Sequence, residues 1–223
     1  MNSLTYKLIA KDFHQHRLLI AGTIAIGLIS LLVAGAGTLM LFNIGMLCWL
    51  TAIAAYGCVL AMLSISGERK ERALLFVLSL PLGYRDYVRL KLFGVMLCFL
   101  APWATLTAGA VVLVLAKPGM ADGILPFAIL LCGFLLTNFS MVLSCALFAR
   151  SEGFITLVII VHNIAISLFI YLVGPIPAFR DHLQDASPTW GPEFWIVLAV
   201  EAATLFVIFS LPYFVVARRR DFI

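Results

Sequence analysis

The segment SGERKERALLFVLSLPLGYRDYVRLKLFG, residues 66–94, carries six of the fifteen Lys and Arg residues in the chain. It separates two long apolar runs, and the whole sequence of 223 residues is 63% hydrophobic and only 12% charged. Soluble globular chains are about 45–50% apolar and about 25% charged. The composition therefore predicts a membrane protein in which residues 66–94 contain a charged loop between two spans.

Six runs of apolar sequence are long enough to cross a bilayer, which requires about 20 residues of helix. They cover residues 18–37, 44–66, 92–115, 124–148, 154–173 and 194–216. Only a short stretch separates the first two runs, which predicts a tight hairpin, with one long bent helix as the alternative. We expect an all-α integral membrane fold in which residues 1–223 form a single transmembrane domain.

The distribution of basic residues indicates how these spans are oriented. Thirteen Lys and Arg residues precede the first span, follow the last, or lie in the loops at 67–91 and near residue 150. The other side of the spans carries only Lys117 and Arg180. Because cytoplasmic loops are enriched in Lys and Arg, both termini and the 67–91 loop are expected in the cytoplasm. The basic residues form no stripe interleaved with exposed aromatics, so nucleic acid is not an expected partner.

Two segments outside the spans are expected to lie along the membrane surface. In residues 1–17, apolar and basic side chains fall on different faces of a helical wheel, which is typical of an amphipathic interface helix. In the 67–91 loop, the apolar residues 73–80 are too few to cross a bilayer, and Pro81 cannot continue a helix begun upstream. They predict a short surface helix followed by a corner.

This loop resembles the one between the second and third spans of ABC-2 type transporter permeases. In that family a Glu-Arg-rich segment leads to a Leu-Ser-Leu-Pro corner and to a helix ending in Lys. The matching positions here are Glu68, Arg69, Leu78, Ser79, Leu80, Pro81 and Lys91. Residues 72–75 read Arg-Ala-Leu-Leu, where many members have Gly-Thr-Leu-Glu. The amphipathic N-terminal segment and the six spans also resemble this family, which is of the type V exporter class.

The resemblance implies a role for the loop. It would be a cytoplasmic coupling helix that docks on a separate ATP-binding subunit. The residues expected to make this contact are Glu68, Arg69, Lys70, Glu71, Arg72, Leu78 and Pro81. The chain has no G-x-x-x-x-G-K-[ST] phosphate loop, so we expect no enzymatic activity and no cofactor in this chain; ATP and Mg²⁺ would be bound by the partner.

The resemblance also implies an assembly and a location. Two permease subunits, identical or paralogous, would pair with two ABC ATPase subunits in a bacterial inner membrane, in contact with lipid. The cargo would be a peptide, a lipid or another amphipathic molecule, moved outward. Residues 174–193, which contain four prolines, would form a short re-entrant segment on the outer side.

Inside the expected spans, the ionisable residues Glu201 and His162 and the amides Asn163 and Asn138 are candidate site residues. Ionisable groups at that depth are costly to expose to lipid and should face protein or water. They are candidates either for the translocation path or for hydrogen bonds between helices, and the sequence leaves both open. No metal site is expected, since His14 and His16 at i,i+2 do not share a helix face.

Two other functions fit six spans. One is a small-molecule-binding membrane protein, such as the substrate-capture subunit of an importer. The other is an intramembrane enzyme, although the sequence has neither a G-x-S-x-G nor an H-E-x-x-H motif. The long charged loop favours the permease.

Overall fold

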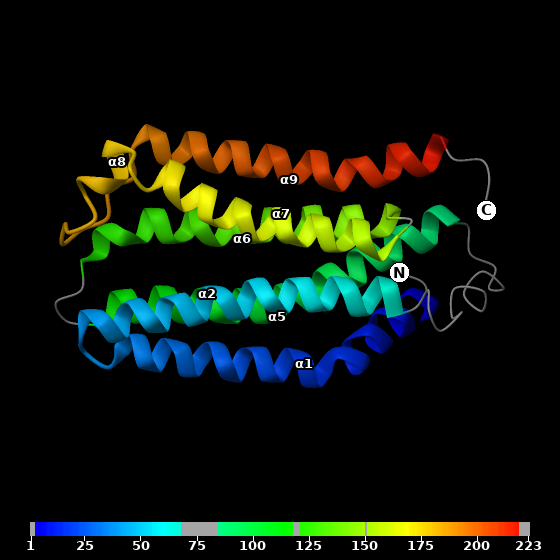
Figure 1. The fold of residues 1–223 in the computed structure, drawn as a ribbon, viewed down its shortest axis with the longest axis horizontal. Coiled ribbons are helices and arrows are strands. Elements are labelled where there is room, and N and C mark those ends of the chain that lie inside the picture. The colour runs from blue at the N-terminus through cyan, green and yellow to red at the C-terminus, as the bar shows by residue number, and fades with distance from the viewer. Residues whose placement is uncertain (1–2, 68–83, 118–120, 150, 219–223) are drawn as a thin grey trace.

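The computed structural model describes residues 3–67, 84–117, 121–149 and 151–218, and these ranges are all-helical (Figure 1). Six of the helices are long and apolar enough to cross a membrane, so the expected six-span, all-α architecture is confirmed. The apolar spans are Ile9–Gly35, Leu39–Ile65, Val88–Ala116, Asp122–Leu147, Gly153–Val173 and Pro192–Leu211.

The helices alternate in direction along the bundle in Figure 1, where both termini lie at one end. In chain order they are α1 (Ser3–Gly35), α2 (Leu39–Ala61), the π-helical turn η1 (Met62–Gly67), α5 (Tyr84–Ala116), the 3-10 turn η2 (Asp122–Ile124), α6 (Leu125–Phe148), α7 (Glu152–Val173), α8 (Pro177–Arg180) and α9 (Pro192–Arg218). We call the end with the termini the terminus end and the opposite one the α8 end.

The first two spans form a tight hairpin rather than one bent helix. The turn contains Gly37, whose φ of 113° is accessible mainly to glycine. Thr38 then caps α2, because its hydroxyl oxygen accepts a 3.2 Å hydrogen bond from the backbone N–H of Leu41. Beyond the turn the two helices approach closely at Gly45, where a Cβ atom would lie 2.5 Å from the carbonyl oxygen of Ser30.

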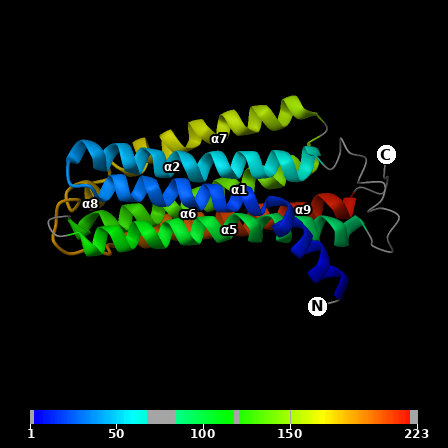
Figure 2. The ribbon, with the colours of Figure 1, turned by 90° about the horizontal axis from the view of Figure 1, so that it is seen from below.

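The N-terminal part of α1 bends away from the rest of the bundle (Figure 2). The helix itself runs unbroken from Ser3, so no helix boundary separates residues 1–17 from the span at 18–37. The physical reason is that neither Gly nor Pro occurs between residues 3 and 21 to interrupt the helix. The amphipathic segment is therefore the first part of α1, and its position at a membrane surface stays a prediction.

Helix α6 is the centre of the bundle. It packs against α2, α5, α7 and α9, and 56% of its span is buried, against 33% or less for the other five spans. Phe139 of α6 stacks on Phe99 of α5, with ring centroids 3.9 Å apart. In the part of the chain that the structure describes, the centre of the bundle is therefore filled by α6.

At the α8 end, residues 174–191 fold back onto the bundle. Phe179 of α8 is buried in an apolar cluster with Leu130 and Phe194, and the backbone N–H of Gly123 donates to the carbonyl of Asp185. The segment therefore packs on α6, η2 and α9, and its expected re-entry into the membrane stays a prediction.

Candidate functional site

The seven residues predicted to contact an ATPase, Glu68, Arg69, Lys70, Glu71, Arg72, Leu78 and Pro81, lie outside the described residues. The structure does describe the two helical segments from which that loop leaves and to which it returns. It also describes the polar residues in the middle of the spans. The candidate functional residues that the structure describes lie in these two regions.

A group of buried polar residues lies where the loop leaves and returns. Lys91 of α5 donates to Asp12 of α1 in an ion pair with a 3.3 Å Nζ–Oδ1 distance. His16 of α1 and Ser64 of η1 are joined by a 3.1 Å hydrogen bond between Nε2 and Oγ. All four residues are at most 7% exposed. We call Asp12, His16, Ser64 and Lys91 the loop-root cluster.

Local sequence places these side chains at one level of the bundle. Asp12 and His16 are spaced i,i+4 and share one face of α1. Asp12 and Lys91 each lie three residues inside their spans, and Ser64 is one residue from the end of its own. Gly94, one turn after Lys91, leaves room for the carboxylate of Asp12, since a Cβ atom there would lie 3.0 Å from Oδ2.

The sequence did not predict this cluster. Lys91 was identified only through the family resemblance, and His16 only as a poor metal ligand. The i,i+4 pair of Asp12 and His16, at the edge of an apolar run, was the available signal. A carboxylate so close to a membrane span requires a partner, but the sequence does not say which.

Glu201 lies in the middle of the apolar span of α9, nine residues after Pro192 and ten before Leu211. This places it ~14 Å from the start of its span at 1.5 Å per residue. Its side chain is 7% exposed and is directed at Gly133 of α6, where a Cβ atom would overlap Oε2. Within the described part of the chain, neither carboxyl oxygen has a hydrogen-bond partner.

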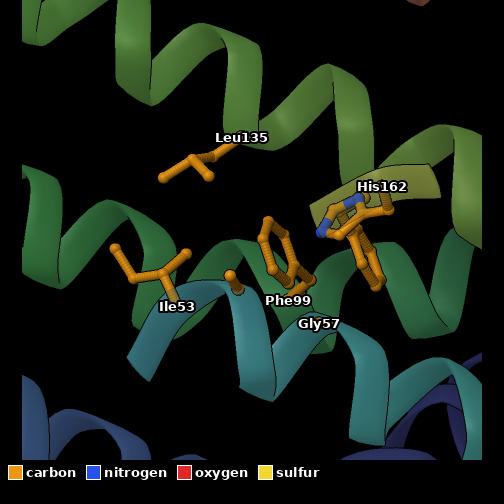
Figure 3. A pocket seen from close by; sticks show the side chains of 7 residues that line it. Ile53, Gly57, Phe99, Leu135 and His162 are labelled. Carbon is orange, nitrogen blue, oxygen red and sulfur yellow. The ribbon is translucent and has the colours of Figure 1, made fainter. Parts of the chain in front are cut away.

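His162 lies at a similar depth in α7 and is 4% exposed. Asn138 of α6 donates a 3.1 Å hydrogen bond to its backbone carbonyl, which joins α6 to α7. The ring of His162 lines a small pocket with Gly57, Phe99 and Leu135 (Figure 3). Both ring nitrogens are without a partner in the described structure, and the pocket is too tight to hold a water molecule.

The structure does not bring Glu201 and His162 to one site. Glu201 contacts α6 at Gly133, and the backbone of His162 contacts it at Asn138, five residues further along. At 3.6 residues per turn these positions are ~140° apart around α6. The two ionisable groups therefore approach the central helix from different faces.

Asn163 is exposed, unlike its neighbour His162, and belongs to a polar surface that sequence analysis missed. Thr156, Asn163, Ser167 and Tyr171 are all exposed on α7. Their spacings of seven, four and four residues place them within ~80° of one helix face. We call these four residues the α7 polar stripe. The spacing of these residues was visible in the sequence. It shows that they share one helix face, but only the structure shows that this face is exposed.

The exposed faces of the other spans differ from this stripe. On α1 beyond residue 17, the exposed side chains are apolar, including Leu18, Ile26 and Leu32. The exposed threonines Thr51, Thr105 and Thr204 each donate to the carbonyl four residues earlier in their own helix, and Asn163 of the stripe donates in the same way to the carbonyl of Ile159. These threonines lie on three different helices, whereas the four residues of the stripe lie along one face of α7.

The family model described as ABC-2 family transporter protein matches residues 7–218. The chain belongs to this family. No curated protein and no solved structure gives a match. This ABC-2 permease is therefore the membrane component of an ABC transporter; it works with ABC ATPase partners and is not itself an ATPase. The assignment favours the permease over an importer substrate-capture subunit and over an intramembrane enzyme.

Proposed function

We propose that this ABC-2 permease forms the translocation path of an ATP-driven exporter as a dimer, with two ATPase subunits bound at the terminus end. In this arrangement the terminus end faces the cytoplasm of a bacterial inner membrane. The cargo is an amphipathic molecule such as a peptide or a lipid. The carrying observation is the α7 polar stripe.

The stripe supports a path between two subunits rather than within one. Polar side chains in a span are expensive to leave facing lipid and are found facing protein or a water-filled cavity. The interior of one subunit is filled by α6, and the pocket beside His162 does not admit water. A face that is exposed in one subunit, yet polar, is suited to line a path formed with a second copy.

The chemistry of this face matches the proposed cargo. The α7 polar stripe offers hydroxyl, amide and phenol groups and no charged side chain. Exposed aliphatic residues flank it on the same helix, among them Ile160, Ile164 and Leu168. Alternating hydrogen-bonding and apolar contacts suit a molecule that carries both kinds of surface.

The charge distribution supports the proposed orientation. The first turns of α1 and α5 and the last turns of η1 and α9 lie at the terminus end, and most of the Lys and Arg residues belong to these helix ends or to the segments that they flank in the sequence. Lys117 and Arg180 belong to the α8 end. By the positive-inside tendency, the terminus end is cytoplasmic, where ATP is available to the partner subunits.

Cysteine cross-linking in membranes tests the paired α7 faces. With a short bis-maleimide, Ser167→Cys should give a larger fraction of cross-linked dimer than the wild-type chain does. The wild-type chain sets the background, because its native Cys48 is exposed. Val200→Cys, on an exposed face of α9, is the matched control and should remain monomeric. Cross-linking at residue 200 but not at residue 167 would overturn the dimer proposed here.

A further inference from the structure

Both helical roots of the 68–83 segment are joined to the same helix, α1. On the entering side, Ser64 of η1 is hydrogen-bonded to His16. On the returning side, Lys91 of α5 is paired with Asp12. These partners are 48 and 79 residues apart in the sequence, so the contacts tie three helices together rather than stabilising one.

The residues of the loop-root cluster are buried, which distinguishes their contacts from a surface ion pair. The side chains of Lys91 and Asp12 are 6% and 10% exposed, and Ser64 is 1% exposed. Exposed ion pairs are weak and easily rearranged, whereas a buried pair that loses one partner leaves an uncompensated charge. The cluster therefore resists separation of α1 from the loop roots in a way that surface charges would not.

The buried hydroxyl groups of α1 bond within their own helix, unlike Asp12 and His16. Thr23 and Ser30 each donate to a carbonyl of α1 itself, four residues earlier. Among the described buried side chains of α1, Asp12 and His16 thus bond to other helices at the level from which the loop departs, while at the opposite end of α1 the backbone carbonyl of Ala34 accepts from Lys117. Ser64 also lies in a π-helical turn, a departure from regular helix that is frequent at functional sites.

We propose that Asp12 and His16 are positioning residues that carry displacement of the 68–83 segment into α1. This inference rests on the proposed function, in which ATPase closure moves that segment. Because α1 is bonded to both roots, the first span moves together with η1 and the start of α5. The first span would then be driven directly, in addition to the two spans to which the loop is covalently joined.

Hydrogen–deuterium exchange on the permease–ATPase complex in lipid nanodiscs tests this inference. Exchange is compared without nucleotide and with ATP plus vanadate, in peptides covering residues 3–20 and 68–83. In the wild-type chain both peptides should change. In the variant Asp12→Ala with Ser64→Ala, the 68–83 peptide should still respond, while the response of the 3–20 peptide is lost.

Two further variants separate transmission from a merely structural role. Ser30→Ala removes a buried α1 hydroxyl that bonds only within its own helix, and it should respond like wild type. Asp12→Asn keeps an oxygen acceptor for Lys91 and should retain a partial response. If the double variant does not fold, Ser64→Ala alone carries the test, with Ser30→Ala as its control.

The outcomes distinguish this inference from the function on which it rests. A 3–20 response that is unchanged in the Asp12 and Ser64 variants, or absent from wild type, overturns the transmission role. ATPase recovery with each chain is measured in the same samples. Failure of the wild-type chain to bind any ATPase would remove the proposed function instead.

Discussion

The phenol of Tyr56 donates a 2.7 Å hydrogen bond to the backbone carbonyl of Cys98, the acceptor that Pro102 leaves without its helical partner. Proline has no N–H group, so the carbonyl four residues earlier in α5 lacks its usual donor. A neighbouring helix commonly supplies that donor inside a membrane. Tyr56 of α2 does so here, and α2 thereby holds α5 at its proline.

Removing this donor should destabilise the bundle more when the proline is present than when it is replaced. We expect Tyr56→Phe to lower the free energy of unfolding by about 1–3 kcal/mol, because a buried carbonyl loses its partner. In a Pro102→Ala background, the N–H of residue 102 can bond to Cys98, so the same change should cost less. Thermal unfolding in detergent of the four chains of this cycle measures the difference, and equal costs in both backgrounds would contradict the assignment.

The buried ion pair between Asp12 and Lys91 should show strong coupling. Asp12→Ala removes the carboxylate beside Lys91 and should destabilise the chain by about 3–5 kcal/mol. Replacing both residues with apolar ones, as in Asp12→Leu with Lys91→Met, should cost less than the single change, since no buried charge remains without its counter-charge. If the losses of thermal stability of Asp12→Leu and Lys91→Met add up to the loss of the double variant, the pair contributes little.

The six spans could be predicted because hydropathy and length alone indicate a membrane helix. Their ends could not, since a helix continues past the bilayer wherever nothing interrupts it. Helix α5 accordingly begins at Tyr84, ahead of the expected span at 92–115, and α1 begins at Ser3. For Glu201 and His162 the sequence left open the translocation path or a hydrogen bond between helices; both residues are buried, and within the described residues neither side chain has a hydrogen-bond partner.

The contacts between helices were beyond such reasoning. Asp12 and Lys91 are 79 residues apart, and no periodicity specifies how two helices are rotated and shifted against each other. Asn163 illustrates the same limit. It follows His162 directly, but successive helical residues differ by ~100° in direction, so one is buried against α6 and α2 while the other is exposed.

Gly133 should be required because of Glu201. We expect Gly133→Ala to destabilise the α6–α9 contact by about 1–3 kcal/mol, because its methyl group would overlap the carboxyl group of Glu201. Combining it with Glu201→Ala should remove this conflict, whereas combining it with the equally large Glu201→Gln should not. Thermal unfolding distinguishes the two pairs. If both second changes behave alike, the carboxyl group does not face Gly133.

Recovery of the ATPase partner should depend on the charged segment that follows Gly67. We expect Glu68→Ala with Arg69→Ala and Glu71→Ala to reduce the ATPase co-purified in detergent about tenfold or more, equivalent to about 1.4 kcal/mol of binding free energy. These residues match the family's coupling loop. Charged groups at a docking surface attract the partner subunit and fix the position in which it binds.

A matched control separates this effect from a general loss of charge. Arg180→Ala with Asp181→Ala and Asp185→Ala also removes one basic and two acidic residues, but from the exposed segment at the α8 end. This chain should recover the ATPase as wild type does. Equal recovery with both triple variants would place the docking surface elsewhere on the permease. Equal loss from both would indicate damage to the fold, which size-exclusion profiles of the two chains would reveal.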